Sequence, residues 1–275
     1  MEDTSFRALG VVRRGPVAEV TLRGPGKGNA MGPDFWREMP ALFAALDDDP
    51  SVRCIVLRGD GPNFSYGLDL MAMMAEMGPL VTGDNLAAER TKLLELIGRM
   101  QEACNRVARC RKPVLAAVAG WCIGGGLDLA AACDIRICSD DARFSLREVK
   151  LAIVADVGSL QRLPRIIGQA HTRQMAYTGG TVDAPSALRI GLVTEVLDSH
   201  EALYARAHSL ADEIAANSPG TVQGIKQVMD YCEDKSTADG LRFVAVWNSA
   251  FLQSADLAEA VQAFMERRPP NFTGR

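Results

Sequence analysis

Several signatures that mark common classes of protein are missing from this sequence of 275 residues. It has no run of roughly 18 apolar residues, so we expect no membrane-spanning helix. The acidic first ten residues lack the apolar centre of a signal peptide, so we expect none. The sequence has 30 lysines and arginines and 34 acidic residues, and the resulting net charge of −4 argues against a general nucleic-acid binder.

Metal and redox motifs are also missing. The three histidines, His171, His200 and His208, form no pair with the spacing of metal ligands, so we predict no metal site. The seven cysteines include no CxxC pair, which argues against a zinc ribbon and a thioredoxin-like motif. Most of them lie in apolar runs, where free buried thiols are common, and we therefore expect a reducing compartment.

The glycine-rich segment 120–126 matches neither common nucleotide-binding loop. A P-loop needs a Lys-Ser/Thr pair after its last glycine, and none follows Gly126. The dinucleotide fingerprint needs a different glycine spacing and an acidic residue about 20 positions further on. Because the chain also lacks a GxSxG elbow, a Ser-His-Asp hydrolase has no support.

Strand and helix patterns alternate over about the first 200 residues. Alternating or continuous apolar runs predict a hairpin over 11–23, turning at Gly15-Pro16, and strands over 53–59, 114–120 and 192–197. Apolar residues at helical spacing predict helices at 33–46, 86–108, 158–167, 169–178 and 183–190, with a short helix before a polar break at 77–85. Such alternation is typical of a parallel or mixed α/β core.

The remainder of the chain, from residue 200 on, shows helix patterns only. They cover 201–216, 221–231, 237–251 and 256–267. A helical segment of this size is too small to form a hydrophobic core of its own, so we expect it to pack on the α/β body or on a neighbouring subunit.

Two glycine-containing loops indicate a site. The strand pattern 114–120 leads through Gly124 and Gly125 into a helix, whose first backbone N–H groups have no helical partner. The loop 64–70 brings Gly67 and the N–H of Leu68 ahead of another helix. Two such amides on one oxygen would form an oxyanion hole, and the alternative is a pair of ordinary tight turns.

Three carboxylates, Asp128, Glu148 and Asp156, lie among apolar neighbours. Buried acids are rare unless they are paired or functional, and burial raises the carboxyl pKa so that a proton can be held and donated. The alternative for each is a helix N-cap or a solvated loop, and Asp156 has the position of an N-cap for the helix expected at 158–167.

The segments NFSYGLDL (63–70) and 117–168 resemble the crotonase, or enoyl-CoA hydratase/isomerase, superfamily, and the resemblance extends over about residues 10–265. It implies an α/β fold with a ββα spiral core and active site in 1–199, and a helical region in 200–275 that packs on the core and on neighbouring subunits. It also implies a homo-oligomer, a trimer or dimer of trimers, that acts on acyl-CoA thioesters. No nucleic acid and no cofactor beyond the substrate's own coenzyme A is implied.

The resemblance also assigns roles to individual residues. By it, Leu68 and Gly125 supply the two oxyanion-hole amides, and Lys27 in the loop 24–31 is a candidate for the coenzyme A phosphates. The remaining positions implied to bind substrate are Ala30, Gly67, Asp69, Leu70, Met71 and Gly124.

Within the superfamily, hydratases that resemble crotonase carry glutamate at the positions of Asp128 and Glu148, and glycine at that of Asp156. The acids found here, and the segment 148–164 around them, resemble the Δ3,5-Δ2,4-dienoyl-CoA isomerases of fatty-acid β-oxidation. That resemblance implies proton transfer from C2 to C6 by Glu148 and Asp156, with either residue at either end, and an orienting role for Asp128. Alternatives are a 2-enoyl-CoA hydratase, a Δ3-Δ2-enoyl-CoA isomerase, or a non-catalytic acyl-CoA-binding subunit.

The location follows from the ends of the chain. The eukaryotic isomerases of this kind carry targeting ends, and the last residues here, FTGR, are no peroxisomal address. We therefore expect a bacterial cytoplasmic protein.

Overall fold

The computed structural model describes residues 6–24, 28–82 and 86–275, and its centre is a six-stranded sheet in the order β1-β2-β3-β4-β6-β9. The strands are β1 (Leu9–Arg14), β2 (Val17–Leu22), β3 (Cys54–Gly59), β4 (Val114–Val118), β6 (Ile135–Ser139) and β9 (Glu195–Leu197). β1 and β2 pair antiparallel, as the hairpin prediction requires, and the other neighbours pair in parallel. The predicted mixed α/β core is confirmed.

A second, three-stranded sheet lies beside the first and helps to build the site. Its strands are β5 (Trp121–Ile123), β7 (Arg143–Ser145) and β8 (Thr181–Asp183), in the order β5-β7-β8. Because β5 leads directly from β4 into α4 (Gly125–Ala131), the chain passes from the large sheet to the small one just before the glycine turn.

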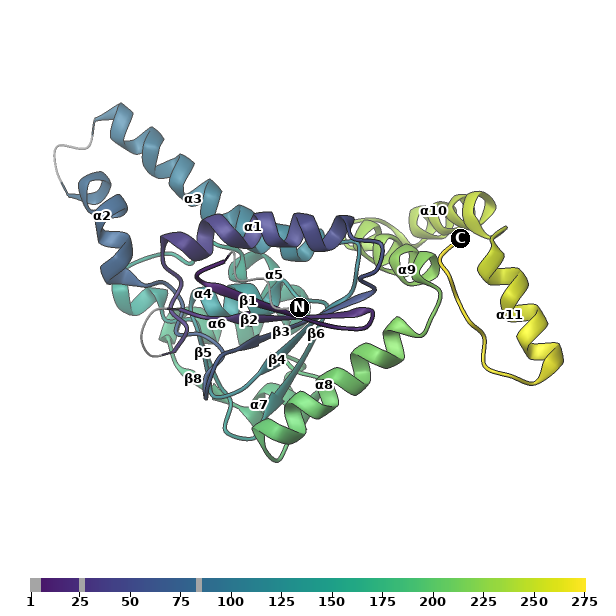
Figure 1. Ribbon diagram of the computed structural model, residues 1–275. Coiled ribbons are helices and arrows are strands. Elements are labelled where there is room, and N and C mark those ends of the chain that lie inside the picture. Colours follow the sequence, from purple (N-terminus) through teal and green to yellow (C-terminus); the bar gives the residue numbers. More distant parts are fainter. Residues whose placement is uncertain (1–5, 25–27, 83–85) are drawn as a thin grey trace.

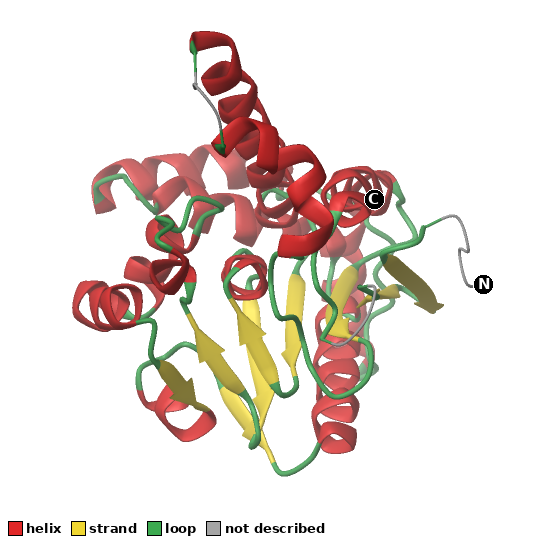
Figure 2. Cartoon of the chain, turned by 90° about the vertical axis from the view of Figure 1, so that its left-hand side faces the viewer, coloured by secondary structure: helices red, strands yellow, loops and turns green. Residues whose placement is uncertain are grey.

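Helices cover both faces of the large sheet (Figures 1 and 2). On one face, α1 (Pro33–Asp48) and α3 (Ala87–Ala108) contribute large apolar side chains such as Phe43 and Met100 to the main core. On the other face, α8 (His200–Ala215) lies flat on the strands through Ala207 and Ala211, which pack against Val56 and other strand residues. The alanines let the helix approach the sheet closely.

The helix after the first glycine loop is longer than the sequence predicts. The predicted polar break at 77–85 is wrong in its first part, because α2 runs Leu70–Val81 straight through Pro79. Met77 and Leu80 pack against the core cluster, and this packing outweighs the missing proline N–H. Together α2 and α3 project from one end of the body (Figure 1).

Four short helical elements follow later in the chain: η1 (Glu148–Leu151), which begins with one of the three acids, α5 (Ser159–Ile166), α6 (Gly168–Thr178) and α7 (Ala184–Arg189). After β9, the described chain holds helices only, as predicted. We call α9 (Pro219–Cys232), α10 (Thr237–Phe251) and α11 (Ala255–Glu266) the C-terminal arm, and it extends from the end opposite to α2 (Figure 1).

Within the described residues, no helix has both the length and the hydropathy that a bilayer span needs. The division at residue 199/200 stays a prediction. The structure adds that α8, the first helix of the predicted second region, belongs to the core through its packing on the sheet.

Candidate active site

Neighbouring parallel strands place the two glycine loops at one edge of the sheet. β3 and β4 are adjacent and parallel, so the chain that follows each leaves from the same edge. The first loop is then bonded to β5, since Ser65 N donates to Trp121 O at 3.0 Å and Ile123 N donates to Ser65 O at 2.9 Å. These bonds fix the loop that carries Gly67 and Leu68 against the turn that carries Gly124 and Gly125.

The backbone amides of Leu68 and Gly125 lie close together and lack protein acceptors. A Cβ placed on Gly125 would lie 3.7 Å from Leu68 N, and one placed on Gly67 would lie 2.9 Å from Gly125 N. In the part of the chain that the structure describes, neither amide donates a hydrogen bond to another residue. Amides left unpaired inside a protein are costly, so this pair is suited to receive an oxygen from a ligand.

Glycine is required at both sides of this amide pair. Gly67 has φ +80° and Gly124 has φ +52°, both in the region that side chains disfavour. A Cβ on Gly67 would meet Ile123 O at 2.6 Å, and a Cβ on Gly124 would meet Glu148 Oε1 at 3.0 Å. The second distance places the carboxylate of Glu148 directly beside the glycine turn.

Glu148 begins η1, and its carboxylate has one buried oxygen without a partner. Oε2 accepts no hydrogen bond within the described residues, although its residue is largely covered. The pKa of Glu148 is raised to about 7, chiefly by burial and to a smaller extent by the negative charges of Asp128 and Asp156, while a hydrogen bond from its own backbone N–H opposes the rise. A carboxylate with this pKa is a base matched to neutral pH.

Asp128 lies in the first turn of α4 with 1% of its surface exposed. Its Oδ1 accepts from Ser159 N at 2.5 Å and from Ser159 Oγ. Burial raises the pKa of Asp128 to about 6, against the two bonds from Ser159 and the charge of Arg162, which lower it. Asp128 therefore joins the N-terminus of α5 to α4.

Asp156 is half-buried in the loop between η1 and α5. The alternative that Asp156 is the N-cap of α5 is wrong, because Gly158 has that position. The carboxylate that accepts from the first amide of α5 belongs to Asp128. Burial raises the pKa of Asp156, while a hydrogen bond from its own backbone N–H lowers it. Its charge in turn contributes to the raised pKa of both Asp128 and Glu148, so the three carboxyl groups lie within electrostatic range of one another and form one cluster.

The other predicted substrate contacts lie around the first loop. Ala30 adjoins Met31, whose N–H donates to Gly67 O at 2.7 Å. Asp69 is the N-cap of α2 and accepts from Ala72 N at 2.9 Å, a structural role that its position explains. The next two residues of α2 are more open, Leu70 with 42% and Met71 with 84% of its surface exposed. Lys27 lies outside the described residues.

Three residues that the sequence does not single out hold the first loop and two of the acids in place. Ser65 Oγ donates to Asn29 O at 2.9 Å and accepts from Gly67 N at 3.0 Å, so it shapes the first loop. Ser159 fixes Asp128, and Gln101 on α3 donates to Asp156 O at 2.7 Å. No local pattern marks them, because each acts on a residue far away in the sequence.

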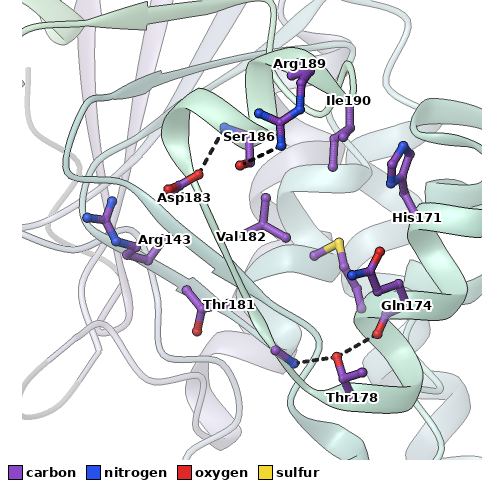
Figure 3. A pocket seen from close by; sticks show the side chains of 12 residues that line it. Arg143, His171, Gln174, Thr178, Thr181, Val182, Asp183, Ser186, Arg189 and Ile190 are labelled. Atoms are coloured by element: carbon purple, nitrogen blue, oxygen red, sulfur yellow. Dashed lines mark hydrogen bonds between the residues drawn. The ribbon is translucent and has the colours of Figure 1, made fainter.

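A second cavity, of about 460 Å³, lies between α6 and the β8–α7 segment (Figure 3). Its polar groups already bind one another: Ser186 N donates to Asp183 Oδ1, and Arg189 donates to Ser186 Oγ, both at 3.0 Å. Its lining contains none of the predicted site residues. Asp156 instead borders a larger cavity, of about 1070 Å³, between the core and α9. The chemistry is therefore best sought at the acid cluster.

Comparison with known proteins identifies the family of the chain. Residues 13–275 match the family model described as enoyl-CoA hydratase/isomerase. The chain belongs to the enoyl-CoA hydratase/isomerase family. The crystal structure of a putative enoyl-CoA hydratase from Streptomyces coelicolor superimposes with a TM-score of 0.90 at 29% identity, over 99% of this chain and 96% of that one. The predicted crotonase-like fold is thereby confirmed.

Two relatives in the family carry the same name. The mitochondrial Delta(3,5)-Delta(2,4)-dienoyl-CoA isomerase of Homo sapiens is 43% identical over 97% of this chain and 81% of its own length. The peroxisomal enzyme of that name from Arabidopsis thaliana is 41% identical over 98% of each chain. The predicted resemblance to dienoyl-CoA isomerases within the superfamily is confirmed.

The same comparison corrects the expected location. We predicted a bacterial cytoplasmic protein, and this is wrong, because the relatives named as dienoyl-CoA isomerases are eukaryotic enzymes described as mitochondrial or peroxisomal. Targeting signals are short segments that are read separately from the fold, so the core and site residues carry no information on compartment.

Proposed function

We propose that this protein is a Δ3,5-Δ2,4-dienoyl-CoA isomerase. The observation that carries the proposal is the cluster of Asp128, Glu148 and Asp156 beside two unpaired backbone amides. The names of the relatives support the same activity. The substrate brings its own coenzyme A, and the proposed reaction needs no further cofactor.

The amides of Leu68 and Gly125 receive the thioester oxygen of the substrate. A proton next to a thioester is too weakly acidic for a carboxylate to remove unaided, because the charge must move onto the carbonyl oxygen. One well-placed donor stabilises such an oxyanion by about 3–4 kcal/mol. With two donors on one oxygen, the enolate becomes accessible to a carboxylate base.

Glu148 takes the proton from C2. Its carboxylate lies beside Gly124, one residue before the Gly125 amide, and C2 is the atom bonded to the thioester carbon that this amide serves. Its raised pKa of about 7 makes it a stronger base than an ordinary glutamate. At neutral pH both its ionised and its protonated forms are accessible, as a general base requires.

Asp156 donates a proton to C6. When the C2–H bond breaks, its electron pair spreads over the thioester oxygen and along both double bonds to C6. A new C6–H bond forms with the proton of Asp156, and the double bonds end at C2 and C4. Glu148 is then protonated and Asp156 ionised, and the proton returns through the cluster or solvent. The burial that raises the pKa of Asp156 favours the protonated state this step needs.

Asp128 orients and tunes the other two acids. It is fixed by two bonds from Ser159 and lies within electrostatic range of both Glu148 and Asp156. Three carboxyl groups in one buried cluster do not all ionise together, so the charge of Asp128 helps the cluster to retain a proton. Asp156, whose pKa is raised by burial, is the group that must hold a proton for delivery at C6.

We further propose that the core (1–199) and the helical region (200–275) assemble as a trimer or a dimer of trimers. The C-terminal arm exposes an unusual number of large apolar side chains, including Phe264 at 85% and Met265 at 71%. Exposed apolar surface of this kind marks association sites. A second copy of the chain is the partner that the family resemblance implies.

A substrate comparison tests the proposed function. Purified protein is incubated with a 3,5-dienoyl-CoA, with crotonyl-CoA and with a 3-enoyl-CoA, and the products are separated and identified. We expect conversion of the 3,5-diene to the 2,4-diene at a rate well above any hydration of crotonyl-CoA. Faster hydration, faster conversion of the 3-enoyl substrate, or binding without any turnover would overturn the proposal.

A further inference from the structure

The segment that carries Asp156 is a loop with few attachments. It joins η1 to α5, begins at Ala152 with φ +57° and ends at Gly158 with φ +133°. Ala155 and Val157 point into the core, each with 8% of its surface exposed, whereas Val154 is 75% exposed. The side chain of Asp156 thus lies between two buried neighbours, but apolar contacts alone do not fix its main chain.

Hydrogen bonds to the loop's main chain are scarce. Across residues 154–157, the described chain provides two, both from side chains. Arg162 Nη1 donates to Val157 O at 3.5 Å, the outer limit of such a bond. Gln101 Nε2 donates to Asp156 O at 2.7 Å. The short bond from Gln101 is therefore the main polar attachment of the residue that carries the acid.

We infer that Gln101 is a positioning residue for proton transfer at C6. The inference rests on the proposed function and extends it to a residue outside the acid cluster. Gln101 lies on α3, which packs into the core through Met100, Ala103 and Cys104. It holds the Asp156 main chain to a rigid helix, and through it the position of the carboxyl group.

The chemistry of the donor matters as well as its position. A lysine or arginine at 101 would hold the same carbonyl but would place a positive charge beside Asp156 and lower its pKa. The neutral amide of glutamine attaches the loop without that charge. Asp156 thus keeps the raised pKa that burial gives it and can hold the proton to be donated.

The two halves of the reaction depend on different elements. Glu148 and the amides of Leu68 and Gly125 come from η1 and the glycine loops, and none of them bonds to Gln101 within the described chain. Loss of the Gln101 bond should therefore slow protonation at C6 and leave proton removal at C2 intact. A merely structural residue would affect both steps alike.

The test compares Gln101→Met with Gln161→Met. Methionine matches glutamine in length but cannot donate, and Gln161 is an exposed residue that borders the same cavity as Asp156. The substrate is a 3,5-dienoyl-CoA with two deuterium atoms at C2. Formation of the 2,4-diene measures the whole reaction, and loss of deuterium from unconverted substrate measures the C2 step.

We expect Gln101→Met to lower kcat about tenfold, since misplacing a reacting group by even 1 Å costs up to about 100-fold. KM and the deuterium loss should stay within about twofold of the unaltered protein, and Gln161→Met should behave like the unaltered protein. Gln101→Leu, which also lacks a donor and brings no charge, is expected to match Gln101→Met and is used if the methionine variant folds poorly.

Equal kcat in the Gln101 variants and the unaltered protein would overturn the inference, and so would a parallel fall in turnover and deuterium loss. Failure of the proposed function gives a different result, because the unaltered protein itself would then form no 2,4-diene.

Discussion

At the scale of single residues, the account depends on carboxyl groups whose pKa values are raised by burial. Asp128, Glu148 and Asp156 were identified from the sequence as acids in apolar surroundings, and the structure brings them into one cluster. The sequence could not show which of them caps a helix. That assignment depends on the approach of Ser159 to Asp128, two residues 31 positions apart.

The pH dependence of catalysis should report Glu148. Its folded pKa of about 7 lies above the ordinary 4.5, so the ionised base is lost as the pH falls through 7. The prediction concerns the acidic limb of the kcat/KM profile, on which the base becomes protonated. We expect an acidic limb centred near pH 7. A limb centred near 4.5 would show that Glu148 is not the base that titrates.

Replacing that base should separate activity from stability. Glu148→Gln is expected to lower kcat at least about 100-fold, since general-base catalysis contributes 10²–10⁴. The same change removes an ionisable group whose charge is disfavoured by burial, so Tm at pH 8 should rise by about 2–4 °C. The gain should be smaller at pH 5, where Glu148 is protonated in the folded protein, and should vanish only below about pH 4.5, where the unfolded chain is protonated as well. Calorimetry at the two pH values provides the check, and a loss of stability at pH 8 would contradict it.

At the scale of elements, the glycine loops illustrate what a local pattern predicts. The sequence predicts a glycine loop ahead of a helix at 64–70, and a strand, glycine turn and helix at 114–131, and both are found in the structure. What the sequence could not show is that the two loops meet. That follows from the parallel pairing of β3 with β4 and from the bonds between Ser65 and β5.

A pair of matched glycine variants tests this meeting point. Gly67→Ala and Gly61→Ala each place a side chain at positive φ, +80° and +66°, so they share the same backbone strain. Only the first pushes a Cβ against Ile123 O and Gly125 N, whereas Gly61 faces open space. We expect Gly67→Ala to lose at least about 100-fold in kcat and Gly61→Ala to retain activity. Similar kcat values in the two folded variants would refute the role of the amide pair.

Another element-scale contact was invisible in the sequence. The carboxylate of the buried Glu19 on β2 forms two hydrogen bonds, one with Arg58 Nε of β3 at 2.9 Å and one with His208 Nε2 of α8 at 2.5 Å. Chiefly through the His208 bond, the pKa of Glu19 falls from 4.5 to about 2. The stability it contributes is therefore present above pH 4.5 and is lost as the pH falls toward 2.

Glu19→Gln should consequently lower the free energy of unfolding by about 2 kcal/mol at neutral pH, the usual scale for buried bonds to a charged group. The difference should shrink on acidification below pH 4.5. Glu195→Gln is the matched control, because the partly exposed Glu195–Arg206 pair is screened by solvent and should contribute less than the buried Glu19. Urea unfolding at pH 7 measures both, and equal losses in the two variants would contradict the account.

At the scale of the whole molecule, the α/β body and the helical end were predictable because hydrophobic periodicity is local. The packing of α8 on the sheet was not, since its small residues Ala207 and Ala211 signal close approach only once the partner strands are known. The projecting C-terminal arm keeps its apolar side chains exposed in a single chain.

The arm supplies a prediction on assembly. Phe264→Asp should shift the protein to a smaller species by light scattering after gel filtration, because it places a charge in the apolar surface proposed to contact another copy. Tyr177→Asp, at an exposed site on α6 with 70% of its surface open, should leave the mass unchanged. A monomeric unaltered protein would refute the proposed trimer.

The most direct test of the central claim uses Asp156→Asn with a 3,5-dienoyl-CoA in heavy water. The variant keeps the amide pair and Glu148 but has no proton to deliver at C6. Our account predicts at least about 100-fold slower formation of the 2,4-diene, with deuterium still entering C2 and with unchanged substrate affinity. Full isomerase activity in the variant, or loss of C2 exchange together with turnover, would contradict it.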